Sequence, residues 1–177
     1  MKKIFTPIIV VLLLLMMVGV ASAKPPDPKN YVALLRGANE VPARETPARG
    51  ISVFHLKRDG TQLGYVLAVA KIDNVVAAHV HCGAPGVNGP VGATLFSGGT
   101  PGSGPVNGVL AKGTITAPDA NNGCGWATLA DVAAAMQSGN TYVNVHTNDG
   151  IPPTNTGPGD FPGGEIRGQV QAKSPHR

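Results

Sequence analysis

The sequence predicts an all-β domain, an antiparallel sandwich or barrel of about eight strands with one short helix. Short apolar runs rich in β-branched residues follow one another along most of the chain. Gly, Pro, Asn and Asp separate these runs. Hydrophobic residues make up 42% of the 177 residues and charged residues only 14%. This balance excludes a disordered chain and a long exposed helix, and the length suits one domain with a real core.

The first 23 residues read as a signal peptide. Lys2 and Lys3 precede an apolar stretch, Ile8–Val20, and Ala21-Ser22-Ala23 is the small-x-small pattern of a cleavage site. A retained membrane anchor is the alternative. We expect a secreted or periplasmic protein with a Pro-rich lead-in at 24–29, a domain at 30–171 and a tail at 172–177.

Cleavage would leave 12 basic and 10 acidic residues, because Lys2 and Lys3 are lost from the 14 Lys and Arg. A net charge this small, without a basic run, does not favour nucleic acid as a partner. After cleavage no membrane contact is expected, and we expect a monomer whose partner is an extracellular protein or a small ligand.

Eight runs of five to ten residues are predicted strands, and an Asp-Gly hairpin signal, Arg58-Asp59-Gly60-Thr61, lies between the second and the third. The runs are Tyr31–Leu35, Ile51–Lys57, Leu63–Lys71, Val75–His81, Val91–Phe96, Gly108–Thr116, Thr141–Thr147 and Glu165–Gln171.

One segment departs from the strand pattern, because its apolar residues recur at helical spacing. Thr128 can cap its start, Asp131 completes a pattern that resembles a capping box, and Gly139 suits the end. We predict a helix over 129–137 at one end of the sandwich, with its apolar face formed by Leu129, Val132, Ala133 and Met136.

Cys82 and Cys124 are the two cysteines of the chain. An even count and an oxidising compartment favour a disulfide between them, with two buried thiols as the alternative. A bridge over this span would stabilise the fold by about 4 kcal/mol in the chain-entropy model. The two Cα atoms should then lie within about 4.4–6.8 Å of each other.

The alternation of side chains along a strand puts His79 and His81 on one face, about 6.6 Å apart at Cα. On another predicted strand, Asn144 and His146 share the polar face. Imidazole suits copper, zinc, iron and nickel, so the three histidines could hold a metal if the two strands are neighbours. Exposed polar faces of a sandwich explain the same alternation.

The opposite faces of these strands should be buried. Glu165 and Arg167 lie two apart on the polar face and could form an ion pair, bind a partner, or be a solvated or loop-bracing pair. Glu40 lies at a turn and has the same alternatives, and Asn144 or Glu165 could hold a ring N–H of a metal-bound histidine.

The faces of these strands opposite the polar ones are apolar and should lie against the core. The residues predicted to be mostly buried are Val76, Val80, Val143, Val145, Ile166 and Val170.

Four motifs in order resemble the chordin-type (CHRD) domain, of the kind found singly in exported bacterial proteins and repeated in animal chordin. They are Gly37–Pro42 (GANEVP), Ala78–Val91 (AHVHCGAPGVNGPV), Tyr142–Thr147 (YVNVHT) and Gly163–Gln169 (GGEIRGQ). The resemblance implies an immunoglobulin-like β-barrel distantly similar to copper–zinc superoxide dismutase. In that enzyme a His-x-His strand supplies copper ligands, so His79, His81 and His146 would be ligands here.

Three functions are compatible with these residues. The first is an exported binding module without enzymatic activity, and the second is a copper-binding protein that uses His79, His81 and His146, with zinc as the less favoured metal. The third is a superoxide-dismutase-like redox enzyme at the same site. It ranks last because the sequence has no bridging histidine and no zinc-site cluster, and no nucleophile motif indicates any other enzyme class.

Overall fold

The computed structural model describes residues 29–173 as nine strands, one α-helix and one 3-10 turn. The elements are β1 (Lys29–Arg36), the 3-10 turn η1 (Gly37–Asn39), β2 (Arg49–Leu56), β3 (Leu63–Asp73), β4 (Val75–Cys82), β5 (Val91–Phe96), β6 (Pro105–Ile115), α1 (Leu129–Gln137), β7 (Thr141–Thr147), β8 (Ile166–Gln169) and β9 (Gln171–Lys173). The expected signal peptide and most of the lead-in lie outside the described residues.

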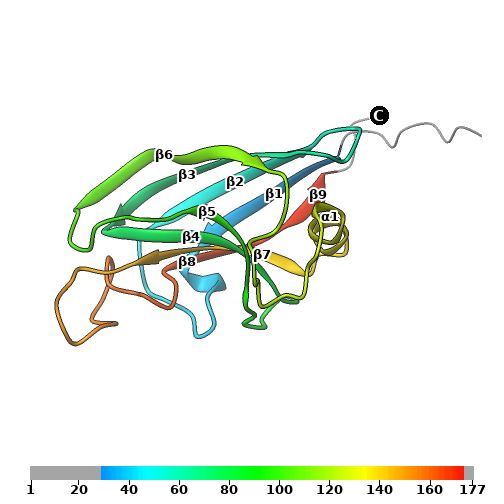
Figure 1. The fold of residues 1–177 in the computed structure, drawn as a ribbon. Coiled ribbons are helices and arrows are strands. Elements are labelled where there is room, and N and C mark those ends of the chain that lie inside the picture. Colours follow the sequence, from blue (N-terminus) through cyan, green and yellow to red (C-terminus); the bar gives the residue numbers. More distant parts are fainter. Residues whose placement is uncertain (1–28, 174–177) are drawn as a thin grey trace, which may run out of the picture.

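The strands form one antiparallel sheet in the order β5-β4-β7-β8-β1-β2-β3-β6, with β9 paired to β1. The sheet curls until its two outer strands face each other, so the fold is a nearly closed barrel (Figure 1). The Tyr65 hydroxyl on β3 donates to the Leu95 carbonyl on β5 across this seam, at 2.7 Å. The predicted all-β class is confirmed.

All eight predicted strands are present, and the last is divided. Val170 separates β8 from β9, and its N–H donates to the Thr141 carbonyl. The sheet takes in Lys29 from the expected lead-in and Ala172–Lys173 from the expected tail. Gly60 in the predicted hairpin has φ 71° and donates to the Lys57 carbonyl, as a tight turn requires.

The helix begins and ends as the sequence predicts, and α1 lies at one end of the barrel beside β9 (Figure 1). Thr128 and Asp131 form the capping box, and Gly139 has φ 71° just after the last turn. Leu129, Val132 and Met136 are buried against the core. No helix of the described residues is both long enough and apolar enough to cross a membrane.

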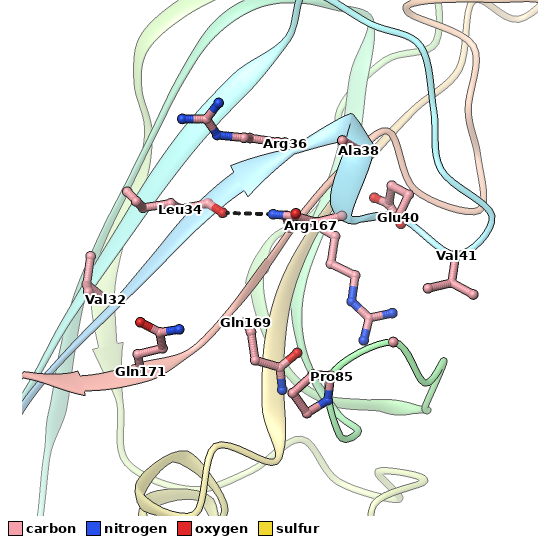
Figure 2. A pocket seen from close by; sticks show the side chains of 12 residues that line it. Val32, Leu34, Arg36, Ala38, Glu40, Val41, Pro85, Arg167, Gln169 and Gln171 are labelled. Carbon is pink, nitrogen blue, oxygen red and sulfur yellow. Dashed lines mark hydrogen bonds between the residues drawn. The ribbon is translucent and has the colours of Figure 1, made fainter.

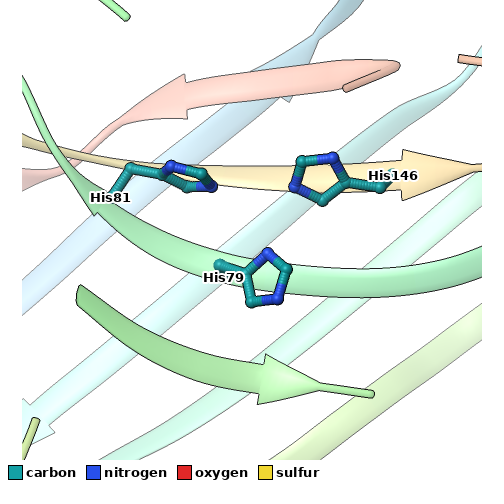
Figure 3. Close-up of side chains that lie close together, drawn as sticks. All are labelled: His79, His81 and His146. Atoms are coloured by element: carbon teal, nitrogen blue, oxygen red, sulfur yellow. The ribbon is translucent and has the colours of Figure 1, made fainter. Parts of the chain in front are cut away.

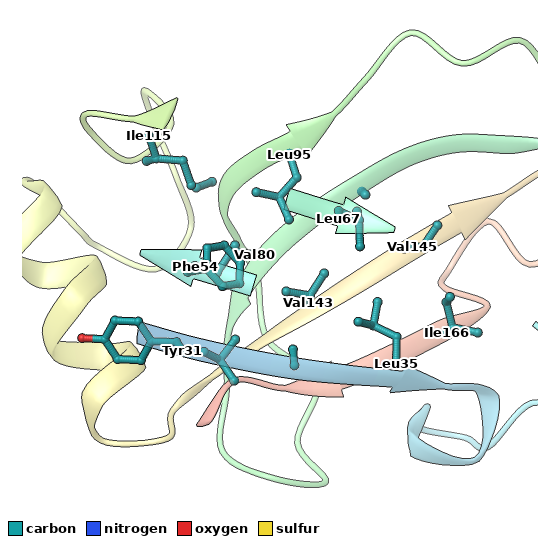
Figure 4. Close-up of a cluster of buried hydrophobic side chains, with 14 of the residues drawn as sticks. Tyr31, Leu35, Phe54, Leu67, Val80, Leu95, Ile115, Val143, Val145 and Ile166 are labelled. Carbon is teal, nitrogen blue, oxygen red and sulfur yellow. The ribbon is translucent and has the colours of Figure 1, made fainter. Parts of the chain in front are cut away.

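The core fills the barrel with apolar side chains from every wall, including Tyr31, Phe54, Leu67 and Val143 (Figure 4). Five of the six residues predicted to be buried are so, and Val76 is not. A bulge between Val75 and Ala77 shifts the pairing of β4 with β7. Val75 therefore turns into the core and Val76 is left half-buried.

The disulfide is confirmed: Cys82 and Cys124 are bonded, with Cα atoms 5.8 Å apart. It ties the end of β4 to the loop before α1. Both sulfurs lie near the Pro90 carbonyl, so the bridge anchors the 83–90 loop that follows His81.

Candidate metal centre

Three histidines from two neighbouring strands converge on one small volume. β4 carries His79 and His81, and β7, which pairs with β4, carries His146 (Figure 3). The ring centroids are 5.0 to 5.8 Å apart. One ring nitrogen from each residue lies within 4.8 Å of the other two. The pairing of β4 with β7 is the condition that the alternation alone left open.

Hydrogen bonds from the Nδ1 atoms of His81 and His146 fix which nitrogen of each ring carries the proton. His81 Nδ1 lies 2.9 Å from the Gly89 carbonyl, and His146 Nδ1 lies 2.9 Å from the Pro162 carbonyl. A carbonyl only accepts hydrogen bonds, so each Nδ1 carries the proton and each neutral ring has its lone pair on Nε2.

The nitrogens that face inward have no partner. His79 Nδ1, His81 Nε2 and His146 Nε2 are buried and make no hydrogen bond within residues 29–173. A buried polar atom without a partner costs about 1–3 kcal/mol, and three such atoms lie together here. The donor set therefore fits a metal ion that prefers imidazole nitrogen.

Burial keeps the three rings neutral. Desolvation lowers the pKa of His146 to about 4, despite its hydrogen bond to Pro162. Desolvation also lowers the pKa of His81, and it lowers that of His79 more than nearby Asp119 raises it. Neutral imidazole is the form that binds a metal, so burial keeps the three rings in that form to a lower pH than an exposed histidine.

An aromatic and cationic stack supports His81 from behind. The Tyr142 ring lies parallel to the His81 ring at 4.8 Å, and the Arg167 guanidinium lies 3.4 Å from the centre of the Tyr142 ring on β7. The N–H of Gly89 donates to the Tyr142 hydroxyl, and this hydroxyl lies within donating distance of the Gly89 carbonyl. The same carbonyl accepts the hydrogen bond from His81 Nδ1. Tyr142 is not among the residues predicted for the site, although it shares the polar alternation of Asn144 and His146.

The structure places neither Asn144 nor Glu165 on a histidine ring, contrary to the expectation that one of them holds a ring N–H. Asn144 Nδ2 donates to Glu40 Oε2 at 3.4 Å. The carboxylate of Glu165 accepts from the hydroxyls of Thr46 and Thr147 and from the N–H of Gly159. Backbone carbonyls from the loops beside the histidines take the ring N–H groups instead, which side-chain alternation could not reveal.

Glu165 and Arg167 are buried, so they are not the solvated pair that the sequence left as one alternative, and each contacts a loop beside the histidines. Glu165 binds the 148–164 loop through Gly159. Arg167 binds the 83–90 loop by donating to the Val87 carbonyl at 2.8 Å and to Asn88 Oδ1 at 3.0 Å. Each residue therefore supports the loop that holds one histidine.

Glu40 is a buried carboxyl at the rim of a pocket of about 610 Å³, which Arg167 also lines (Figure 2). Burial raises its pKa to about 7, although Arg167 and the hydrogen bond from Asn144 act against this. Its Oε1 has no partner. Glu40 therefore exchanges a proton near neutral pH.

Glu40 and His146 should act on stability in opposite directions. Between pH 6.5 and 4 the unfolded chain protonates His146 and the folded protein does not, so acid lowers the free energy of unfolding. Between pH 4.5 and 7 the folded protein retains the Glu40 proton that the unfolded chain releases. The free energy of unfolding therefore falls as the pH rises through this range.

We therefore expect Glu40→Gln to raise the free energy of unfolding by about 2–3 kcal/mol at pH 7.5 and to change it little at pH 4.5. Urea unfolding of metal-free protein at both pH values measures this. Glu45→Gln, at an exposed position, is the control. An equal effect of Glu40→Gln at both pH values would contradict the expectation.

The chain matches the CHRD domain family over residues 31–170, which is nearly the whole described structure. No curated protein and no solved structure matches it. The match covers the strands that carry the three histidines, both supporting loops and the disulfide. The chain therefore belongs to the CHRD domain family.

Proposed function

We propose that this CHRD domain is an exported binding module that holds one copper ion through His79, His81 and His146. The single observation that carries this function is the set of three buried ring nitrogens without hydrogen-bond partners, which lie together. Export is supported by the N-terminal signal pattern and by the disulfide.

Copper is favoured over zinc by its affinity for imidazole nitrogen. Three imidazoles suit either ion, because zinc sites that keep an open position also have three protein ligands. Copper stands above zinc in the general order of affinity for nitrogen sites. Bonds of about 2.0–2.1 Å would bring the nitrogens about 3.3–3.6 Å apart, so small ring rotations would complete the site.

Calorimetric titration with Cu²⁺ and with Zn²⁺ tests this function. Wild-type protein should bind about one Cu²⁺ per chain, more tightly than Zn²⁺. His81→Ala and His146→Ala should each abolish binding. His55→Ala is the matched control, because His55 is exposed and pairs with Asn30 away from the cluster. No binding by wild type, or binding by both cluster variants that equals that of wild type, would leave the three histidines a structural role.

The pH dependence of copper binding provides a second readout. An unperturbed histidine site would lose affinity as the pH falls through about 6.5. The lowered pKa values of the three rings move this loss to lower pH, because protons compete with the metal only near the actual pKa. A superoxide dismutation assay of the copper-loaded protein tests the redox alternative.

A further inference from the structure

One outer face of the barrel carries an apolar stripe that crosses four neighbouring strands. The strand register aligns Val32, Val53 and Val66 in one row and Leu34, Ile51, Ala68 and Val109 in the next. Leu34, Ile51, Val53, Val66 and Val109 are each 40 to 63% exposed, so no described element covers them. Single exposed apolar residues need no explanation, but seven in adjacent register positions form a surface of the kind that binds partners.

Cationic side chains surround this stripe. Arg36 on β1 and Arg49 on β2 lie opposite each other, beyond the row that contains Leu34 and Ile51. Lys112 on β6 lies opposite Val66, at the end of the other row. Lys173 pairs with Asn30 near the other side. The one acidic residue of the four strands is Asp73, at the end of β3. The face is therefore apolar in its middle and positive around it.

Shallow hollows lie along this apolar stripe, between its side chains and the charged ones beside it. A hollow of about 330 Å³ lies among Leu34, Arg36, Arg49 and Ile51. A second hollow of about 570 Å³ lies among Val53, Val66 and Lys112. The pocket in Figure 2 continues the hollowed surface past Val32 and Leu34 to Gln169 and Gln171.

We propose that this face binds an amphipathic α-helix of a partner protein, with the helix's apolar stripe on the floor and its Asp or Glu residues against Arg36, Arg49 and Lys112. Four strands spaced by about 4.8 Å and two rows about 7 Å apart match the footprint of a helix about 10 Å wide. A second copy of the chain would place cations against cations. A bilayer is less favoured, because the exposed residues of the stripe include no Trp, Tyr or Phe to anchor it at a membrane surface.

Two synthetic helical peptides of about 14 residues test this inference. Both carry the same Leu stripe, one flanked by Glu and the other by Lys. Fluorescence anisotropy should show binding of the Glu peptide only, weakened at high salt. Leu34→Asp with Val53→Asp should reduce affinity at least about tenfold, and Arg36→Glu with Arg49→Glu should reverse the preference. Ile151→Asp, at an exposed residue of the 148–164 loop, is the control and should leave binding unchanged.

Equal binding of the two peptides, or no loss in the Leu34 and Val53 variant, would overturn the inference. So would self-association in sedimentation equilibrium that the same variant abolishes, since a second copy would then occupy the face. Co-sedimentation with phosphatidylglycerol vesicles, lost in the same variant, would overturn it in favour of a membrane. Circular dichroism of each variant confirms that the fold is intact.

Discussion

Glu165→Ala is expected to lower the free energy of unfolding by about 3–5 kcal/mol, because it removes the acceptor of two buried hydrogen bonds and one partly buried one. The hydroxyl of Thr46, the hydroxyl of Thr147 and the N–H of Gly159 would each lose their partner. An unpaired buried donor costs about 1–3 kcal/mol, and the small side chain would leave a cavity as well.

Glu165→Gln should cost less, about 1–3 kcal/mol, since its amide keeps the shape and one acceptor oxygen but turns an NH₂ group toward a donor. Urea unfolding of metal-free protein gives these values. Glu45→Ala, at an exposed position, should stay within about 0.5 kcal/mol of wild type. A Glu165→Ala variant as stable as this control would show that the carboxylate does not hold the loops.

Glu165→Ala should also weaken copper binding. Glu165 holds Gly159 and Thr147, and the Thr147 hydroxyl in turn accepts from the N–H of Phe161 at 2.9 Å. The next residue, Pro162, supplies the carbonyl for His146. Loss of such supporting contacts typically reduces metal affinity about 10–100-fold. Calorimetry on the folded variant measures this loss.

The fold was predictable because its signals are local. Apolar runs with period-two alternation, the Asp-Gly turn at Asp59 and the capping box at Thr128 each depend on a few adjacent residues. The prediction for Val76 was wrong because a bulge changes the side of the sheet that a residue faces. The residues Val75–Ala77 contain no local signal that predicts this bulge.

The candidate site was predictable only in its ligand types. His79 and His81 follow from strand geometry, but their proximity to His146 depends on the pairing of β4 with β7, and β7 begins 59 residues after β4 ends. The buried positions of Glu165 and Arg167 depend on loops that fold over the polar face, so alternation alone places these residues in solvent. The lowered histidine pKa values have the same origin, since burial by those loops causes them.

Substitution of Arg167 is expected to affect both the free energy of unfolding and the candidate metal centre, and to have the largest combined effect on the two. Arg167 is 2% exposed, and its guanidinium lies over the Tyr142 ring and donates to Val87, Ala84 and Asn88 of the 83–90 loop. Arg167→Ala should lower the free energy of unfolding by about 3–5 kcal/mol, because it leaves a cavity in place of a buried side chain, breaks three partly buried hydrogen bonds and removes the cation from the ring.

Arg167→Lys separates charge from geometry. Lysine keeps the positive charge but lacks the planar fork that meets several acceptors while stacking on a ring, so we expect a loss of about 2–3 kcal/mol. Arg36 pairs with Arg167 in the sheet register but is exposed, so Arg36→Lys is the matched control and should change stability by less than about 0.5 kcal/mol.

Copper binding by the folded Arg167→Lys protein distinguishes a role at the metal centre from a purely structural one. The guanidinium, the Tyr142 ring and the His81 ring are stacked, and Tyr142 also contacts the Gly89 backbone whose carbonyl holds His81. Loosening the stack should therefore weaken copper affinity about 10–100-fold. Lost stability with unchanged copper affinity would confine Arg167 to the loop, whereas loss of both would place it among the residues that orient His81.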